Sequence, residues 1–147
     1  MTMHRRPLGR GRTLAALGGA ITVVGCLLTW WQVGGTPGIT ATSGNGLAGS
    51  GILVFLVGIA TVALVALPYA AGDRPVGLDR PLAFMILAVA GWIGFGWQVI
   101  QLVLNDQFQF TAPAEVFTNG PGVWIAALGL VLLSRAAWTM TRESAYR

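Results

Sequence analysis

The chain has 147 residues, of which 54% are hydrophobic and 10% charged, and its mean hydropathy is +0.69. Soluble domains carry about 25% charged residues, so the charges here are too few to cover a water-soluble surface. The apolar content excludes a disordered chain, and the single cysteine, Cys26, excludes a disulfide scaffold. The composition therefore predicts an integral membrane protein in contact with the lipid bilayer.

Four apolar stretches follow one another along the chain, each close to the ~20 residues that a helix needs to cross a bilayer. Short segments rich in glycine, proline and polar residues separate them. We therefore predict an all-α fold, a four-helix membrane bundle that forms a single transmembrane domain over residues 1–147. The predicted spans cover residues about 14–33, 51–71, 81–104 and 122–140.

The basic residues are all arginine, and they fall on one side of the predicted topology. They precede the first span, lie between the second and third, or lie at and after the end of the fourth. The other two loops carry only Asp106 and Glu115 as charged residues. Because cytoplasmic loops attract basic residues, we predict that both termini are cytoplasmic and that the protein lies in the inner membrane. The arginines are Arg5, Arg6, Arg10, Arg12, Arg74, Arg80, Arg135, Arg142 and Arg147.

The basic N-terminal segment is interpreted first as a topological signal that holds the first helix in place. Binding of anionic lipid is compatible with that role. Nucleic acid is not a predicted partner, because no aromatic or folded module accompanies the arginines. The segment ending at Cys26 loosely matches a lipoprotein cleavage site, but the apolar run continues beyond it to Trp31. We therefore expect Cys26 to be a structural thiol packed in a helix.

An internal repeat links the two halves of the chain. Trp31-Gln32-Val33 recurs as Trp97-Gln98-Val99, and glycines open the second and fourth spans at Gly51 and Gly122. Each copy holds two spans, so the copies keep the same orientation and would be related by an axis along the membrane normal. The predicted architecture is two parallel-repeat helical hairpins, covering residues about 12–72 and 79–141.

The outer Trp31, the Gly-rich segment 34–50 after it and the Gly49-Ser50-Gly51 helix start carry a resemblance to a known group. The chain resembles small, uncharacterised four-span bacterial membrane proteins over most of its length. The resemblance implies the same topology. Because that group has no established activity, it implies no active residue.

Stripes of small and polar residues mark one face of the first and third predicted helices, since they recur at steps of three and four. Membrane helices pack through such residues, so we predict that spans one and three face each other at the bundle centre. An alternative is that the polar members line a vestibule for a neutral solute. The two stripes are Gly18, Thr22, Gly25, Thr29 and Gln32, and Gly91, Gly94, Gln98, Gln101 and Asn105.

Tryptophans near the ends of the spans fit the aromatic belts of membrane proteins. We expect Trp30, Trp31 and Trp124 to be interfacial anchors at the outer boundary and Trp138 at the inner one. Trp92 lies about midway along the third span, where a packing or lipid-facing role is expected.

The predicted spans contain no Asp, Glu, His or Lys in their apolar interior. Proton relays, haem or metal ligation and hydrolytic triads all need such groups, and disulfide chemistry needs a cysteine pair. We therefore predict that the protein is not an enzyme and binds no cofactor or metal. The predicted function is a non-catalytic accessory or structural subunit that associates with other membrane protein subunits or with further copies of itself. The alternative is a facilitator or channel for a small neutral solute that acts as an oligomer.

Overall fold

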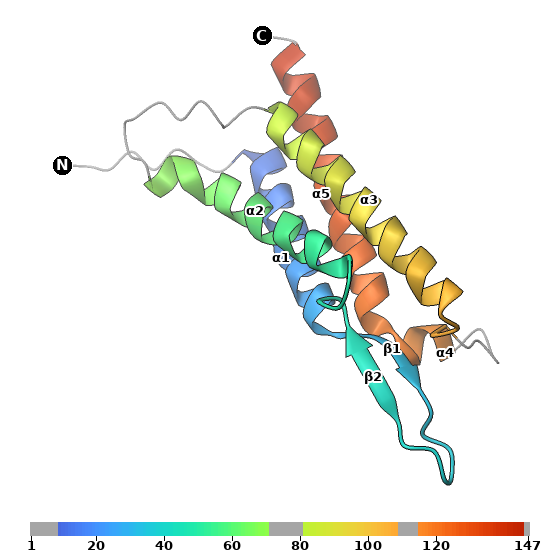
Figure 1. Cartoon of the computed structure of the whole chain (residues 1–147). Coiled ribbons are helices and arrows are strands. Elements are labelled where there is room, and N and C mark those ends of the chain that lie inside the picture. Colours follow the sequence, from blue (N-terminus) through green and yellow to red (C-terminus); the bar gives the residue numbers. More distant parts are fainter. Residues whose placement is uncertain (1–8, 71–80, 109–114, 146–147) are drawn as a thin grey trace.

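The computed structural model describes residues 9–70, 81–108 and 115–145, and this part of the chain is mostly helical. Of the predicted topological arginines, Arg5, Arg6, Arg74, Arg80 and Arg147 lie outside the described residues. The elements in chain order are α1 (Arg10–Leu27), β1 (Thr29–Val33), β2 (Thr42–Asn45), α2 (Gly51–Ala70), α3 (Pro81–Leu104), α4 (Glu115–Asn119) and α5 (Pro121–Ala145) (Figure 1).

Three helices of the described chain are long and apolar enough to cross a membrane: α2, α3 and the Pro121–Glu143 segment of α5. Their bounds lie close to those predicted for the second, third and fourth spans. The protein is therefore a membrane protein by the length and composition of these helices. The first helix, α1, has a shorter apolar stretch than these three. Arg10 and Arg12 occupy its start, so the apolar stretch covers residues 13–27, or ~22 Å of helix.

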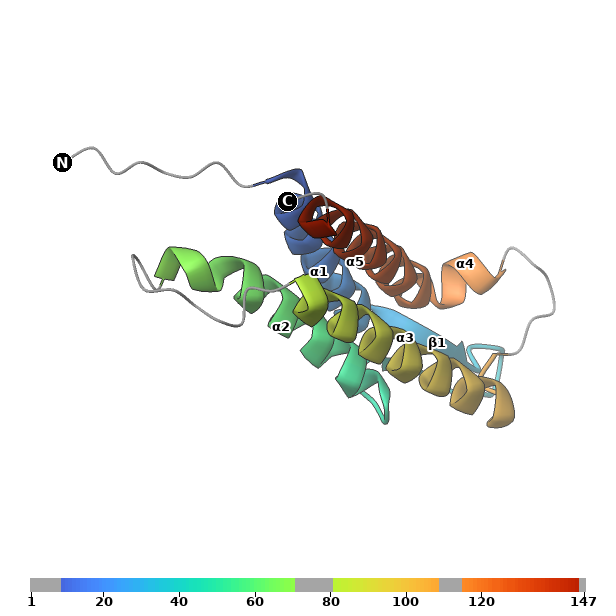
Figure 2. The ribbon, with the colours of Figure 1, turned by 90° about the horizontal axis from the view of Figure 1, so that it is seen from above.

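The long helices lie side by side, with α1 packed on α5 and α2, and α3 packed on the same two helices. Viewed from above, α1 and α5 form one layer and α2 and α3 the other (Figure 2). The prediction that the first and third helices face each other is therefore wrong. Small residues of α1 contact small residues of α5. A Cβ added at Gly18 would lie only 2.8 Å from the carbonyl oxygen of Gly129, so the two helices approach closely there.

The glycines of α3 meet larger side chains instead. A Cβ on Gly91 would lie 2.6 Å from the Leu130 side chain, and one on Gly94 would lie 3.0 Å from Leu53. The two glycine stripes therefore do not complement each other across the bundle. Each is filled by a neighbouring helix that offers a matching surface.

The first predicted span is wrong at its outer end, where the helix stops at Leu27 and the chain becomes extended at Leu28. Thr29–Val33 form β1, which pairs antiparallel with β2, so the fold is not purely α-helical. Thr, Trp and Val favour strands, and the pairing with β2 satisfies backbone groups that a longer helix would have satisfied internally. Thr29 and Gln32 therefore leave the helical stripe to which they were assigned.

The internal repeat is not reproduced at its most specific motif. Trp31-Gln32-Val33 lies in a strand, whereas Trp97-Gln98-Val99 lies inside α3. Gly51 and Gly122 do lie in corresponding places, at the first and second residues of α2 and α5. The sequence match thus does not correspond to two copies of one local structure.

Candidate functional site

The β1–β2 hairpin extends past the ends of the long helices and is the part of the chain that stands away from the bundle (Figure 1). Its register pairs Trp31 with Gly44 and Val33 with Thr42. Residues 34–40, which follow β1, are exposed. Gly34, Gly35 and Gly38 adopt positive φ angles of 86°, 93° and 93°, which side chains other than glycine rarely allow. The sequence therefore builds a tight, glycine-dependent tip.

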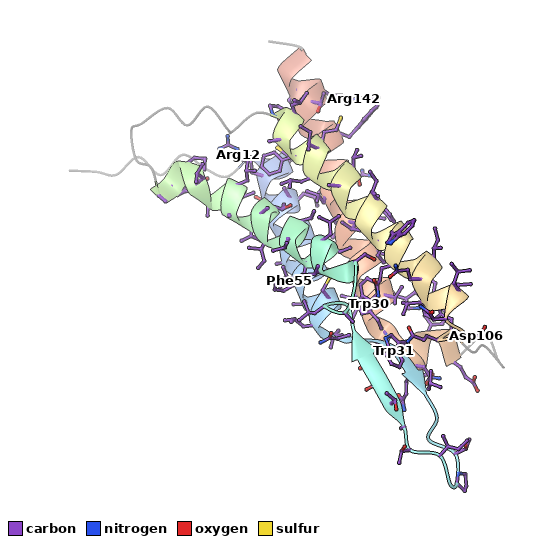
Figure 3. All side chains as sticks on the ribbon, in the orientation of Figure 1. Arg12, Trp30, Trp31, Phe55, Asp106 and Arg142 are labelled. Carbon is purple, nitrogen blue, oxygen red and sulfur yellow. The ribbon has the colours of Figure 1, made fainter. Side chains whose placement is uncertain are left out.

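Trp30 joins this hairpin to the bundle (Figure 3). Its side chain is fully buried, and its Nε1 donates a hydrogen bond of 2.9 Å to the carbonyl oxygen of Gly25 at the end of α1. Its ring meets Phe95 of α3 edge to face, with ring centroids 5.6 Å apart. Gly46 and Gly122 leave room for the indole, since a Cβ on either would lie within 2.7 Å of it. The assignment of Trp30 as an interfacial anchor is therefore wrong, because the hairpin closes over it.

A second link joins the base of the hairpin, directly after β2, to α1. The backbone N–H of Gly46 donates a hydrogen bond of 2.9 Å to the carbonyl oxygen of Cys26. The Cys26 thiol is free and fully buried, which matches the expected structural thiol. Trp31, by contrast, is half-buried and lies against the backbone of Gly44 across the sheet.

Gln98 connects α3 to the start of α2. It is only 4% exposed, and its Oε1 accepts hydrogen bonds from the Ser50 hydroxyl at 2.8 Å and from the Gly51 N–H at 3.1 Å. The first N–H groups of a helix have no partner within the helix, so this amide oxygen acts as a cap supplied from another helix. Gln101 is half-buried one turn further on, and Asn105 is exposed. The polar stripe of α3 thus runs from the packed junction to the surface.

Gly18, Thr22 and Gly25 of the first-helix stripe lie on the buried face of α1. The Thr22 hydroxyl does not bond across the interface. It donates to the carbonyl oxygen of Gly18 in its own helix at 2.8 Å. The close approach of α1 and α5 therefore depends on small size, with a Cβ on Gly25 directly blocked by the backbone of Ala126.

The remaining tryptophans lie on the outside of the helices. Trp124 is 44% exposed and stacks on Phe117, and Trp138 is 57% exposed beneath the guanidinium of Arg142. Trp92 donates from Nε1 to the Ser134 hydroxyl at 2.9 Å and so links α3 to α5, as expected for a packing role.

The two ends of the bundle carry different side chains. Arg12 and Arg142 lie at one end, and Trp31 and Asp106 lie near the other, which carries the hairpin (Figure 3). We name these the arginine end and the hairpin end.

Trp30, Gly46, Ser50, Gly51, Phe95 and Gln98 form one packed junction at the hairpin end, which we call the hairpin junction. Within the described residues, every buried polar side-chain atom has a hydrogen-bond partner. No group of three or more His, Cys, Asp and Glu that could hold a metal ion occurs among them. The junction is a structural connection, because its contacts fix the orientation of the hairpin relative to α1, α2 and α3.

Sequence reasoning missed both the hairpin and the junction. A signal was present, since the run Thr29–Val33 is rich in strand-favouring residues and is followed at once by Gly34-Gly35. Because Trp30 and Trp31 are apolar, this run was interpreted as the end of the first membrane helix. The cap formed by Gln98 leaves no local pattern, because its partners lie 47 and 48 residues earlier in the chain.

Comparison of the chain with protein-family models, with curated proteins and with solved structures found no match. The function is therefore argued from the geometry of the hairpin and the bundle.

Proposed function

We propose that the chain crosses the inner membrane four times, with both termini in the cytoplasm and the hairpin outside. The described arginines support this orientation because Arg10, Arg12 and Arg142 lie in the terminal turns of helices at the arginine end. Although α1 is the least apolar of the long helices, its 18 residues give a length of ~27 Å, and α2 and α5 cover much of it. The parallel repeat plays no part in this proposal.

We propose further that the protein is a non-catalytic accessory subunit of a larger membrane complex. In this role the helices anchor the protein and the hairpin reaches the partner outside the membrane. The observation that carries the proposal is the hairpin junction: buried Trp30, bonded to Gly25 and packed on Phe95, holds a projecting hairpin in a fixed orientation. A segment that served only to connect two helices would need no such attachment.

The exposed part of the hairpin is suited to contact another protein. Ile39 at its tip is 63% exposed, and Thr42 and Ser43 of β2 are exposed as well. The sheet has two strands in the described chain, and β1 packs against α4 and α5. The backbone edge of β2 that faces away from β1 is therefore an outer edge of the sheet. Such an edge can pair with a strand of a partner.

A site-specific crosslinking experiment tests the proposal. A photoreactive residue at Ile39, in native membranes, should crosslink to one partner in a saturable 1:1 product. Leu82 is the matched control, because it is 66% exposed but lies at the arginine end of α3. A variant that joins Val33 to Thr42 through Asn-Gly removes the tip, Ile39 included, while keeping the observed register, and the partner should no longer co-purify with it in mild detergent. Recovery of the full chain from mild detergent only as a free monomer or homo-oligomer would refute the proposal.

The alternative function, a facilitator for a small neutral solute, has weaker support. Its candidate lining residues are Gln98, Gln101 and Asn105, but the amide oxygen of Gln98 accepts both of its hydrogen bonds from the start of α2. The interior between α1 and α5 is filled by close glycine contacts such as that of Gly18 with Gly129. A solute path would have to run between copies of the chain, and no contact of the described residues favours it.

A further inference from the structure

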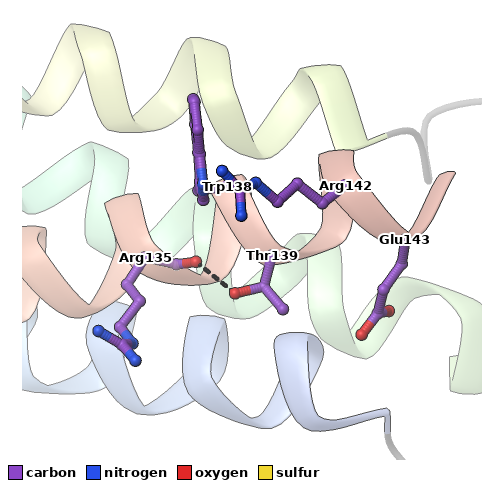
Figure 4. A pocket seen from close by; sticks show the side chains of 5 residues that line it. All are labelled: Arg135, Trp138, Thr139, Arg142 and Glu143. Carbon is purple, nitrogen blue, oxygen red and sulfur yellow. Dashed lines mark hydrogen bonds between the residues drawn. The ribbon is translucent and has the colours of Figure 1, made fainter. Parts of the chain in front are cut away.

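The arginine end of α5 carries a shallow pocket that the hairpin function does not use. Arg135, Trp138, Thr139 and Arg142 occupy positions i, i+3, i+4 and i+7, so one helical face presents all of them. Together with Glu143 they line a volume of about 480 Å³ (Figure 4). Arg135, Trp138 and Arg142 are exposed, and the buried face of the same helix, including Ala136 and Ala137, lies elsewhere on its surface.

The two arginines of this pocket are available to bind an anion. The guanidinium of Arg142 lies 5.1 Å from the ring centroid of Trp138, a cation–π contact that orients it. Within the described chain, neither Arg135 nor Arg142 forms an ion pair with a carboxylate. The Glu143 side chain points away from that of Arg142 (Figure 4), and one carboxylate beside two guanidiniums leaves the pocket cationic.

An apolar track leads from this pocket along the same helix. Leu128 and Val131 lie seven and four residues before Arg135, and they are 53% and 50% exposed. These steps place them on the face of the arginines, toward the middle of the longest helix of the bundle. A cationic, aromatic head above an exposed aliphatic track matches a molecule with a phosphate at one end and a hydrocarbon chain at the other.

We propose that this face of α5 binds one anionic phospholipid, with its phosphate between Arg135 and Arg142 and an acyl chain along Val131 and Leu128. Guanidinium groups bind phosphate through paired N–H donors, and the two arginines are ~10 Å apart along the helix axis, within reach of one headgroup through their long side chains. In the proposed four-span topology, Trp138 near the end of α5 would lie where aromatic side chains meet the headgroups. The apolar track favours a lipid over a free phosphate ion.

Lipid retention by the full chain tests this site. The purified protein is exchanged into mixed micelles containing dioleoyl phosphatidylglycerol or dioleoyl phosphatidylcholine, and bound lipid is counted by native mass spectrometry. We expect one retained phosphatidylglycerol and no retained phosphatidylcholine. The double substitution Arg135→Gln with Arg142→Gln should weaken retention about 30-fold, the loss expected for two arginines at an anionic lipid surface. The matched control, Arg74→Gln with Arg80→Gln, removes the same charge from the segment between α2 and α3 and should retain the lipid.

A second measurement separates site loss from misfolding. Phosphatidylglycerol should raise the thermal unfolding midpoint of the wild-type chain above its value in phosphatidylcholine. The double variant should have the same midpoint in both lipids, equal to that of the wild type in phosphatidylcholine. Equal retention by the wild type and the double variant would overturn the proposal, as would equal loss in the control variant. Stabilisation by inorganic phosphate alone, equal to that by the lipid, would overturn the assignment to a lipid. None of these outcomes depends on whether the hairpin binds a partner.

Discussion

Replacing Gln98 by leucine removes a single acceptor that serves two donors from another helix. Gln98 Oε1 accepts from the Ser50 hydroxyl and from the Gly51 N–H, at 2.8 and 3.1 Å. Leucine fills a similar volume but has no oxygen, so the Ser50 hydroxyl loses its acceptor and the Gly51 N–H keeps only the Ala48 carbonyl oxygen at 3.4 Å. The variant therefore isolates the contribution of the cap.

The expected loss follows from the burial of the two donors. Gly51 is buried, and its N–H would keep only the longer hydrogen bond to the Ala48 carbonyl oxygen, so its cost lies near the low end of the about 1–3 kcal/mol of an unsatisfied buried group. Ser50 is half-buried and its hydroxyl can turn toward solvent, so its contribution lies at the low end of that range. We expect Gln98→Leu to reduce the free energy of unfolding by about 1–2 kcal/mol, which raises the unfolding constant about 5- to 30-fold.

Reversible unfolding in detergent, followed by circular dichroism, measures this difference. Gln101→Leu is the matched control, since Gln101 lies one turn away and is half-buried; we expect it to change stability by less than about 0.5 kcal/mol. Gln98→Glu keeps an acceptor at the start of α2, where a negative charge is favoured, and should restore most of the loss. Equal stability of the two leucine variants would refute the role of Gln98 as a cap.

Two further substitutions test the α1–α5 contact and the hairpin attachment. Gly25→Ala places a Cβ against the backbone of Ala126 and should cost about 1–3 kcal/mol in unfolding free energy, whereas Gly96→Ala, with no atom within 4 Å, should gain about 0.5–1 kcal/mol. Loss of stability in both variants would contradict the close packing assigned to Gly25. Trp30→Phe removes the N–H that binds the Gly25 carbonyl and should cost about 1–2 kcal/mol, with faster hydrogen exchange at the Gly46 amide. Unchanged exchange at Gly46 would show that the hairpin is held by other contacts.

The helices of this chain were predictable where a long apolar run decides the structure by itself. The predicted spans 51–71 and 81–104 match α2 and α3, because ~20 apolar residues in lipid must satisfy their backbone groups internally. The buried faces at Gly18, Thr22 and Gly25 and at Gly91, Gly94 and Gln98 were predictable for the same reason, since a 3.6-residue period places them together.

The partners of those faces were not predictable from one chain. A glycine stripe indicates that a helix can be approached closely, but it does not say which helix approaches. Gly25 is met by Ala126 and Gly94 by Leu53, and these choices depend on the shapes of four surfaces at once. The expectation that two similar stripes meet each other failed because small residues on one helix can equally receive large ones from another.

The two copies of Trp-Gln-Val explain why the first span was predicted too long. Both tripeptides are apolar enough to continue a helix, yet Trp97-Gln98-Val99 is helical and Trp31-Gln32-Val33 is a strand. In α3 the flanking residues Phe95 and Ile100 continue the helix, so the backbone bonds along its own helix. After Val33 come Gly34 and Gly35, both with positive φ, which turn the chain back and bring β2 alongside. The conformation of the first copy is therefore set by the two glycines after it, and the buried Trp30 secures the result from the other side.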